Sequence, residues 1–207
     1  MKERILFFIV GLFILTLGVG LIIQSGLGAS AWDALAVGES KTFGITVGTC
    51  VIINGVLLIF LNSFLLKKKP EYFAGVTIIV IGTLIDFWLL ILEPYTPVNN
   101  LLLQLSFLIT GIVILGIGIA VYLQAKFPAS PMDTLMVAIH KRFGLSLRIA
   151  RIASEGFALT LAFLFKGAIG VGTIIVTVTL GFVVQYFYSY FEFLLNKMGQ
   201  KFSTTKP

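Results

Sequence analysis

Apolar residues dominate this chain in six long runs that carry few charges. The runs lie at about 5–26, 46–66, 73–92, 101–124, 149–166 and 171–194. A helix needs about 20 mostly apolar residues to cross the hydrocarbon core of a bilayer, so each run predicts one transmembrane helix. Two shorter segments, 31–42 and 131–142, begin apolar and end in charged residues. They predict two short helices outside the six spans.

The chain also repeats itself after one hundred residues. Between positions 5 and 48, fifteen residues are identical to the residue one hundred positions later, without a gap. Chance matching of aliphatic residues does not explain the paired polar and small residues among them: Gly11/Gly111, Gly18/Gly118, Gln24/Gln124, Ser30/Ser130, Asp33/Asp133 and Lys41/Lys141. We therefore expect one transmembrane domain over 1–207, with repeat 1 at about 5–93 and repeat 2 at about 101–195. The polar segment 199–207 predicts a disordered tail.

Three spans per repeat is an odd number, so the second repeat enters the membrane upside down relative to the first. The expected fold is an all-α membrane bundle of six transmembrane helices, formed by two inverted three-helix repeats that each carry an extra short helix. Inverted repeats are typical of transporters, and their sites lie where the repeats meet.

The glycines of the first span of each repeat lie on one stripe. Gly11 and Gly18 are seven residues apart, as are Gly111 and Gly118. Small residues let membrane helices approach closely, because lipid supplies no hydrophobic force between them. We expect these glycines to mark the contact between the equivalent helices of the two repeats.

Composition and charge agree with a membrane location. Hydrophobic residues make up 58% of the chain and charged residues 12%, and the mean hydropathy is +1.05. A soluble domain of this size could not bury so much apolar surface. With both termini in the cytoplasm, thirteen of the fifteen Lys and Arg residues lie inside, and Lys41 and Lys166 lie outside. This positive-inside bias explains the net charge of +6 without a nucleic-acid partner.

Candidate chemistry is sparse. Cys50 is the single cysteine and His140 the single histidine, so the chain offers no disulfide framework and no cysteine-based metal site. No phosphate-binding glycine loop or nucleophile elbow occurs, and we expect neither a cofactor nor enzymatic activity. The basic N-terminus, the apolar run and Ala29-Ser30-Ala31 have the form of a secretory signal. Because the same segment recurs at 107–131, we expect a membrane span instead.

Both short segments open with the pattern Ser-x-x-Asp. Serine at a helix N-cap and aspartate three residues later form a capping box, and Pro131 suits the first helical position. If both helices dip into the membrane from opposite sides, their N-termini meet near the midplane and can bind a polar or anionic substrate. The predicted substrate-binding residues are Ser30, Trp32, Asp33, Ser130 and Asp133. The alternative is that both helices lie flat at the two interfaces, and that the serines and aspartates only cap them.

Isolated polar residues interrupt the apolar spans, where such residues usually face a cavity or a partner. The second candidate group is Asn54, Asp86, Arg151, Glu155 and Gln185. Asp86 suits proton coupling, and the alternative is a hydrogen-bonded structural carboxylate. Gln185 is its approximate repeat counterpart. Arg151 precedes Glu155 by four residues, which predicts an ion pair on one helix face. The alternative is that Arg148 and Arg151 anchor an anionic head group or substrate.

The doubled motif resembles a known family. The residues that carry the resemblance are Gly28-Ala29-Ser30-Ala31-Trp32-Asp33, its copy Pro128-Ala129-Ser130-Pro131-Met132-Asp133, and Gly172-Thr173-Ile174-Ile175. With the basic N-terminus, they resemble the YczE/YitT-like bacterial inner-membrane proteins over nearly the whole chain. The resemblance implies a small multi-pass protein of the bacterial plasma membrane, and it brings no catalytic residues and no settled substrate.

We expect a secondary transporter or exporter of a small polar or anionic metabolite, with its site between the repeats. A passive solute channel also fits two half-helices that meet from opposite sides. A non-transporting accessory protein that regulates a partner at the membrane is the third hypothesis. The expected partners are the lipid bilayer, an unknown small molecule and a second copy of the chain, because small subunits commonly pair.

Overall fold

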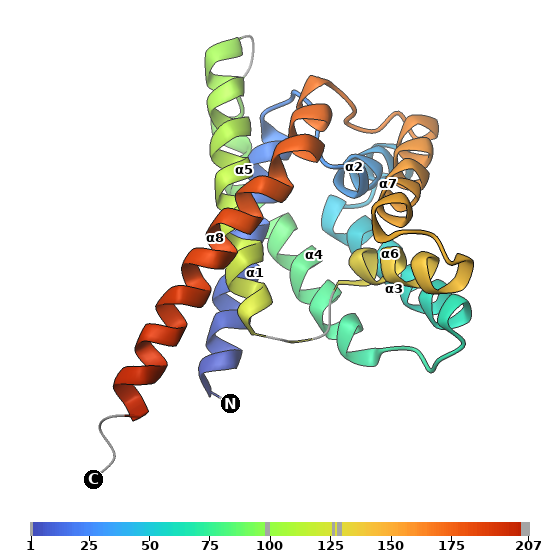
Figure 1. Cartoon of the computed structure of the whole chain (residues 1–207). Helices are drawn as coiled ribbons and strands as arrows, with labels where there is room; N and C mark the ends of the chain where they lie inside the picture. Colours follow the sequence, from blue (N-terminus) through green and yellow to red (C-terminus); the bar gives the residue numbers. More distant parts are fainter. Residues whose placement is uncertain (1, 98–99, 126, 128–129, 204–207) are drawn as a thin grey trace.

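The computed structural model describes residues 2–97, 100–125, 127 and 130–203, and the side chains of those between 5 and 192. Over these residues the chain is all-α (Figure 1). The helices are α1 (Lys2–Gln24), α2 (Ala31–Phe43), α3 (Val47–Leu66), α4 (Tyr72–Leu92), α5 (Leu101–Gln124), α6 (Pro131–Phe143), α7 (Leu147–Leu164) and α8 (Val171–Ser203), with a 3-10 turn η1 (Glu93–Tyr95) after α4. Helix α8 continues to Ser203, into the segment expected to be disordered, and residues 204–207 lie outside the described part.

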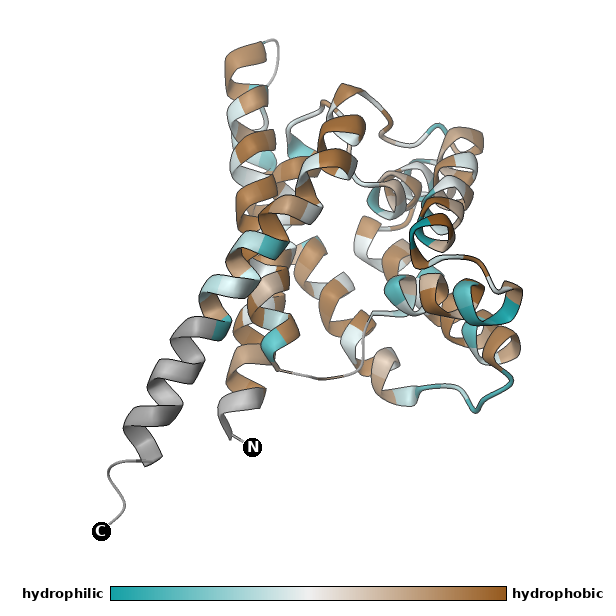
Figure 2. Ribbon diagram, viewed as in Figure 1, coloured by the Kyte–Doolittle hydropathy of each residue, from teal (hydrophilic) through white to brown (hydrophobic). Residues whose placement is uncertain are grey.

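Five of these helices are long and apolar enough to cross a membrane. The candidate spans are Ile5–Gln24, Val47–Leu66, Tyr72–Tyr95, Leu101–Gln124 and Val171–Glu192. Apolar residues cover much of their length (Figure 2), and Phe64 and Phe182 are 78% and 73% exposed. A soluble monomer rarely exposes so much contiguous apolar surface, which is suited to lipid.

The remaining three helices are shorter or more charged. Helix α7 has 18 residues and carries Arg148, Arg151 and Glu155 in its first half, and it is not among the five candidate spans. Helices α2 and α6 have 13 residues each. At about 1.5 Å per residue, neither can cross a bilayer.

The two short helices begin where the sequence predicts. Ser30 and Ser130 are their N-caps. Both helices end in a glycine in the left-handed conformation, Gly44 at φ 70° and Gly144 at φ 68°, which a residue with a side chain adopts only with strain. The repeat therefore extends to the way each short helix starts and stops.

Helices α1 and α5 pack closely and antiparallel. A Cβ atom added to Gly11 would lie 2.5 Å from the amide nitrogen of Tyr122, and one added to Gly18 would lie 2.4 Å from that of Leu115. The contacted position moves back along α5 as the glycine moves forward along α1, so the two helices run in opposite directions.

The same two contacts recur with the repeats exchanged. A Cβ atom on Gly118 would lie 2.3 Å from the amide nitrogen of Leu15, and one on Gly111 would lie 3.0 Å from that of Ile22. These are the pairs above with one hundred added to one residue and subtracted from the other. The prediction that the glycines mark the contact between equivalent helices is confirmed.

Each repeat ties its first helix to its last by the same bond. The Gln24 side-chain amide Nε2 donates to the Leu89 carbonyl at 3.3 Å, which joins α1 to α4. The Gln124 Nε2 donates to the Tyr188 carbonyl at 3.3 Å, which joins α5 to α8. The acceptors are 99 positions apart, so Asp86 of α4 corresponds to Gln185 of α8.

The repeats differ in one interface. Helix α3 packs on α4, and a Cβ atom on Gly82 would lie 2.5 Å from the Gly48 carbonyl oxygen. Over the described residues, α7 and α8 do not pack along their lengths. Gly181, the counterpart of Gly82, has no atom within 4 Å of an added Cβ. The α3–α4 pair of repeat 1 is therefore closed, whereas the corresponding α7–α8 pair of repeat 2 is open.

Candidate functional site

The first Ser–Asp pair closes on itself. The Ser30 hydroxyl donates to Asp33 Oδ2 at 2.5 Å, and the Asp33 amide donates to Ser30 Oγ at 3.4 Å. Helix α2 lies outside the candidate spans, and burial raises the pKa of Asp33 to about 6, against the opposing effect of the Ser30 hydrogen bond. A carboxyl group of this kind can gain a proton just below neutral pH.

The loop before α2 is sealed by the connection between α7 and α8. The Ala29 amide donates to the Ala168 carbonyl at 2.9 Å, and the Gly172 amide donates to the Leu27 carbonyl at 2.8 Å. Gly28 has φ 114°, and a Cβ atom there would lie 2.6 Å from the Gly170 amide nitrogen. The chain itself fills the space beside the start of α2.

Trp32 lies between this sealed loop and α7. Its ring is half-buried, and its centroid lies 6.5 Å from that of Phe157. In this arrangement the indole packs against a helix of the other repeat.

The second Ser–Asp pair has the same internal bonds in a different place. The Ser130 hydroxyl donates to Asp133 Oδ2 at 2.9 Å. The Asn62 side-chain amide donates to the Pro131 carbonyl at 2.8 Å, which places the start of α6 against the last turn of α3. Asn62 was not among the predicted site residues.

The two Ser–Asp pairs have different neighbours. The start of α2 lies against the connection between α7 and α8, through the bond of the Ala29 amide to the Ala168 carbonyl, whereas the start of α6 lies against the end of α3, through the bond of Asn62 to the Pro131 carbonyl. Figure 1 shows α2 and α6 at different levels beside α3 and α7. Each short helix packs against both α3 and α7, and the convergence of the two N-termini near the midplane stays a prediction.

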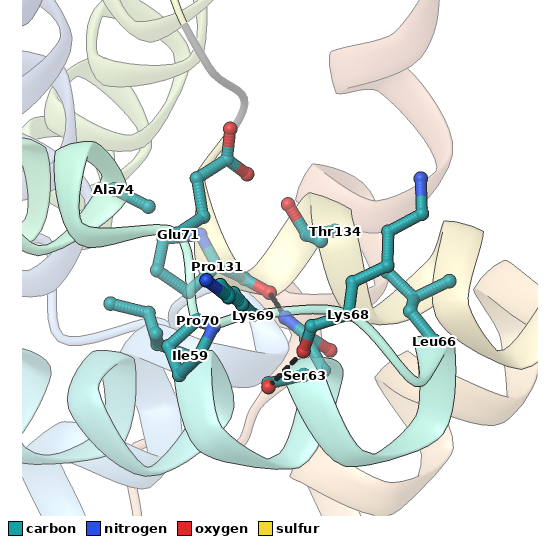
Figure 3. Close-up of a pocket in the computed structure, with 11 residues that line it drawn as sticks. Ile59, Ser63, Leu66, Lys68, Lys69, Pro70, Glu71, Ala74, Pro131 and Thr134 are labelled. Atoms are coloured by element: carbon teal, nitrogen blue, oxygen red, sulfur yellow. Dashed lines mark hydrogen bonds between the residues drawn. The ribbon is translucent and has the colours of Figure 1, made fainter.

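A cavity of about 400 Å³ lies beside the start of α6 (Figure 3). Its walls come from the end of α3, the connection to α4, and the first turn of α6. The lining residues are Ile59, Asn62, Ser63, Leu66, Lys68, Lys69, Pro70, Glu71, Ala74, Pro131 and Thr134. Of the predicted site segments, the cavity takes in the first turn of α6 and leaves out that of α2.

Asp86 joins α4 to the start of α3. Its carboxylate accepts from the Thr46 hydroxyl at 2.6 Å and from the Gly48 amide at 2.7 Å. A carboxylate on free amides at a helix N-terminus is favoured by the helix dipole. This position fits the hydrogen-bonded alternative, and proton coupling through Asp86 stays a prediction. Gln185, the counterpart, is exposed on α8 among Phe182, Tyr186 and Ser189.

The other polar residues of the spans pair locally or across short helices. The Arg151 guanidinium lies 3.0 Å from the Glu155 carboxylate, so the predicted ion pair is confirmed. The buried Asn54 side chain donates to Glu39 Oε2 at 2.6 Å and links α3 to α2. Over the described residues no group of three His, Cys, Asp or Glu side chains is placed to hold a metal.

Sequence comparison places the chain among membrane proteins. A family model described as a family of unknown function, DUF6198, matches residues 2–189. The chain belongs to this family. The uncharacterized protein YyaS of Bacillus subtilis (strain 168) is 39% identical over 178 residues, covering 86% of this chain and 88% of the relative. The uncharacterized membrane protein YczE of the same strain is 33% identical over 181 residues, covering 87% and 83%.

A third relative comes from another organism. An uncharacterized protein of Haemophilus influenzae (strain ATCC 51907 / DSM 11121 / KW20 / Rd) is 35% identical over 178 residues, covering 85% of this chain and 79% of the relative. No solved structure matches the chain. The resemblance to YczE-like proteins is confirmed, and with its five candidate spans this DUF6198 chain is a multi-pass membrane protein.

Several residues of this DUF6198 site were missed from the sequence. Asn62 is an isolated polar residue in an apolar run, as Asn54 is, and the same rule applied to the end of the span would have found it. Lys68 and Lys69 were counted only among the positive charges on the cytoplasmic side. Their position beside α6 depends on contacts about 70 residues apart, for which the local pattern carries no signal.

Proposed function

We propose that this DUF6198 protein is a small secondary transporter or exporter of a polar or anionic metabolite. In this proposal α7 is the sixth span, the two repeats are inverted, and both termini lie in the cytoplasm. Movement of one repeat against the other exposes the site to each side of the membrane in turn.

The observation that carries the proposal is the exchange-symmetric contact between α1 and α5. The contact of Gly11 with Tyr122 becomes that of Gly111 with Ile22 when the repeats are exchanged. A two-fold axis relates two surfaces that contact each other in this way. Because the helices are antiparallel spans, the axis lies in the plane of the membrane, as in inverted-repeat transporters.

The difference between the repeats supports movement. One end of the molecule contains α2 and the other contains the start of α6; we call them the α2 end and the α6 end. At the α2 end, Asp86 holds α4 on the start of α3, and the loop before α2 is sealed by the α7–α8 connection. At the α6 end, α7 and α8 are apart over the described residues, and a cavity lies open beside α6. With Lys67 to Lys69 in the cytoplasm, this arrangement is the inward-open state.

Exchanging the two arrangements gives the outward-open state. Helix α8 would then pack on α7, and Gln185 would reach Ser146, the N-cap of α7 and counterpart of Thr46. Asp86 would leave Thr46 at the same time. Two states of similar energy, which a substrate can bias, are what alternating access requires.

Disulfide trapping tests the exchange without knowledge of the substrate. The background is Cys50→Ala, because alanine already stands at the counterpart position 150. One variant adds Ser146→Cys with Gln185→Cys, and its matched control adds Ser146→Cys with Phe187→Cys, which lies on another face of α8. We expect the first pair to cross-link within one chain in native membranes, and the control pair not to cross-link.

The products distinguish the hypotheses. A single-chain disulfide in the first variant, and not in the control, supports closure of α7 on α8. A two-chain product alone indicates that a second copy covers α8, and it contradicts the exchange. The third outcome is that Ser146→Cys with Gln185→Cys gives no disulfide under oxidation, while Thr46→Cys with Asp86→Cys cross-links fully. This outcome indicates one fixed state and also contradicts the exchange.

A further inference from the structure

We propose that the cavity beside the start of α6 binds a small organic anion that also carries a hydroxyl or amino group. The role of the cavity as the substrate site of a transporter rests on the proposed function. The ability of the cavity to bind such a molecule does not depend on that function. The proposal stands on an unpaired buried amide oxygen, on the charges around it, and on the contrast with the other repeat.

Asn62 is the reason to expect a hydrogen-bond donor on the ligand. Its side chain is 4% exposed and lines the cavity, and its Nδ2 is used by the Pro131 carbonyl. Its Oδ1 has no hydrogen-bond partner in the described structure. A buried acceptor left unpaired is costly, so a ligand that donates an O–H or N–H to this oxygen binds more tightly than one that does not.

The positive charge around the cavity is the reason to expect a negative charge on the ligand. Lys68 and Lys69 line one wall, and Glu71 is the single acidic residue among the lining residues. The first turn of α6 is the positive end of a 13-residue helix dipole. Asp133, the acidic residue of that turn, accepts a hydrogen bond from the Ser130 hydroxyl and does not line the cavity. An anionic group is favoured near the lysines, and Glu71 accepts a second donor from the same ligand.

The other repeat lacks this site. Asn62 corresponds to Ala162, and Thr134 of the cavity wall corresponds to Ala34. A Cβ atom on Gly167 would lie 2.2 Å from the Ala34 carbonyl oxygen, so backbone occupies the corresponding space. The cavity is therefore a specific feature of the α6 end, built on two polar residues that its counterpart does not have.

The volume limits the size of the ligand. About 400 Å³ lies at the lower end of the range of 300–1,000 Å³ that small-molecule sites usually enclose. An anionic group next to an O–H or N–H donor is also found in the head group of an anionic or zwitterionic lipid. The test must therefore separate a soluble metabolite from a lipid.

Binding to purified protein in phosphatidylcholine nanodiscs tests the inference. Two matched pairs of probes differ only by hydroxyl groups: lactate with propionate, and glycerol 3-phosphate with n-propyl phosphate. We expect at least one hydroxylated probe to bind about tenfold more tightly than its partner, because only it pairs with Asn62 Oδ1. Asn62→Ala should abolish that ratio, and a ratio of affinities does not depend on the folded fraction of the variant.

Three lysine variants test the anionic part. Lys68→Gln and Lys69→Gln should each weaken both members of a pair by about threefold to tenfold. Lys67→Gln removes the same charge from a residue that does not line the cavity, and it should change affinity less than twofold at 0.15 M salt. Equal effects of all three lysines would indicate a general surface potential and contradict the assigned site.

Lipid composition identifies the source of the ligand. If nanodiscs with phosphatidylglycerol compete with the soluble probe in wild type and not in Asn62→Ala, the natural occupant is a head group of the proposed chemistry. If they do not compete, it is a soluble anion. No probe binding and no competition would overturn the inference. If binding depends on Asn62 but the α7–α8 disulfide does not form, the binding site is supported and the proposed transport function is contradicted.

Discussion

At the scale of single residues, Asp86 is the side chain that most clearly separates the two halves. Its two hydrogen bonds fasten α4 to the first turn of α3, whereas Gln185 makes no corresponding bond to α7 in the described structure. We predict that Asp86→Ala lowers the free energy of unfolding by about 2–3 kcal/mol, because two hydrogen bonds to a charged group are lost. Thermal unfolding of the purified protein in detergent measures the change. Gln185→Ala is the matched control and should shift stability by less than about 0.5 kcal/mol. Equal losses in both variants would mean that Asp86 does not hold the closed half.

The residues that the sequence placed correctly are those with partners close by in the chain. Ser30 and Ser130 cap the helices that follow them, and Arg151 pairs with Glu155 one turn later. These contacts depend only on helix geometry. The bond between Thr46 and Asp86 spans 40 positions, so no local spacing could reveal it.

At the scale of helices, the glycines of α1 and α5 determine how closely the repeats meet. We predict that Gly18→Ala destabilises the protein by about 1–3 kcal/mol, because the new methyl group would lie 2.4 Å from the Leu115 amide nitrogen. Gly181→Ala is the matched control, since no atom lies within 4 Å of its added Cβ. In a helix, this replacement should stabilise by up to about 1 kcal/mol. Opposite shifts in melting temperature are expected, and a stabilising Gly18→Ala would contradict the close contact.

Helix limits were easier to predict from the sequence than helix directions. The predicted limits of α2 and α6, 31–42 and 131–142, agree with the structure within one residue, because N-cap serines and charged ends are local signals. The direction of each short helix depends on its packing against both α3 and α7. The capping motif does not encode that packing, and for this reason the meeting of the two N-termini cannot be derived from the motif and stays a prediction.

At the scale of the whole molecule, the repeat predicts symmetry and the structure adds its departure from symmetry. The identical glycines and glutamines of the two repeats make equivalent contacts, as the one-hundred-residue match implies. The closed α3–α4 pair and the open α7–α8 pair are not implied by that match. Under the proposed function the protein has two states, and a sequence that serves both states does not specify which of them is seen.

The orientation of the repeats decides whether this asymmetry can serve transport. In the proposal, an impermeant maleimide added to intact cells labels Lys41→Cys and Lys166→Cys in the Cys50→Ala background. It does not label Lys67→Cys or Lys141→Cys until the membrane is opened, because three spans separate the equivalent ends of the repeats. Each substitution removes one positive charge, so the four variants control for one another under the positive-inside rule. If α7 does not cross the membrane, Lys166→Cys shares the protected side of Lys141→Cys, which leaves five spans. If Lys67→Cys and Lys141→Cys lie on different sides, the repeats are not inverted, and an exchange of open and closed ends cannot carry a solute across.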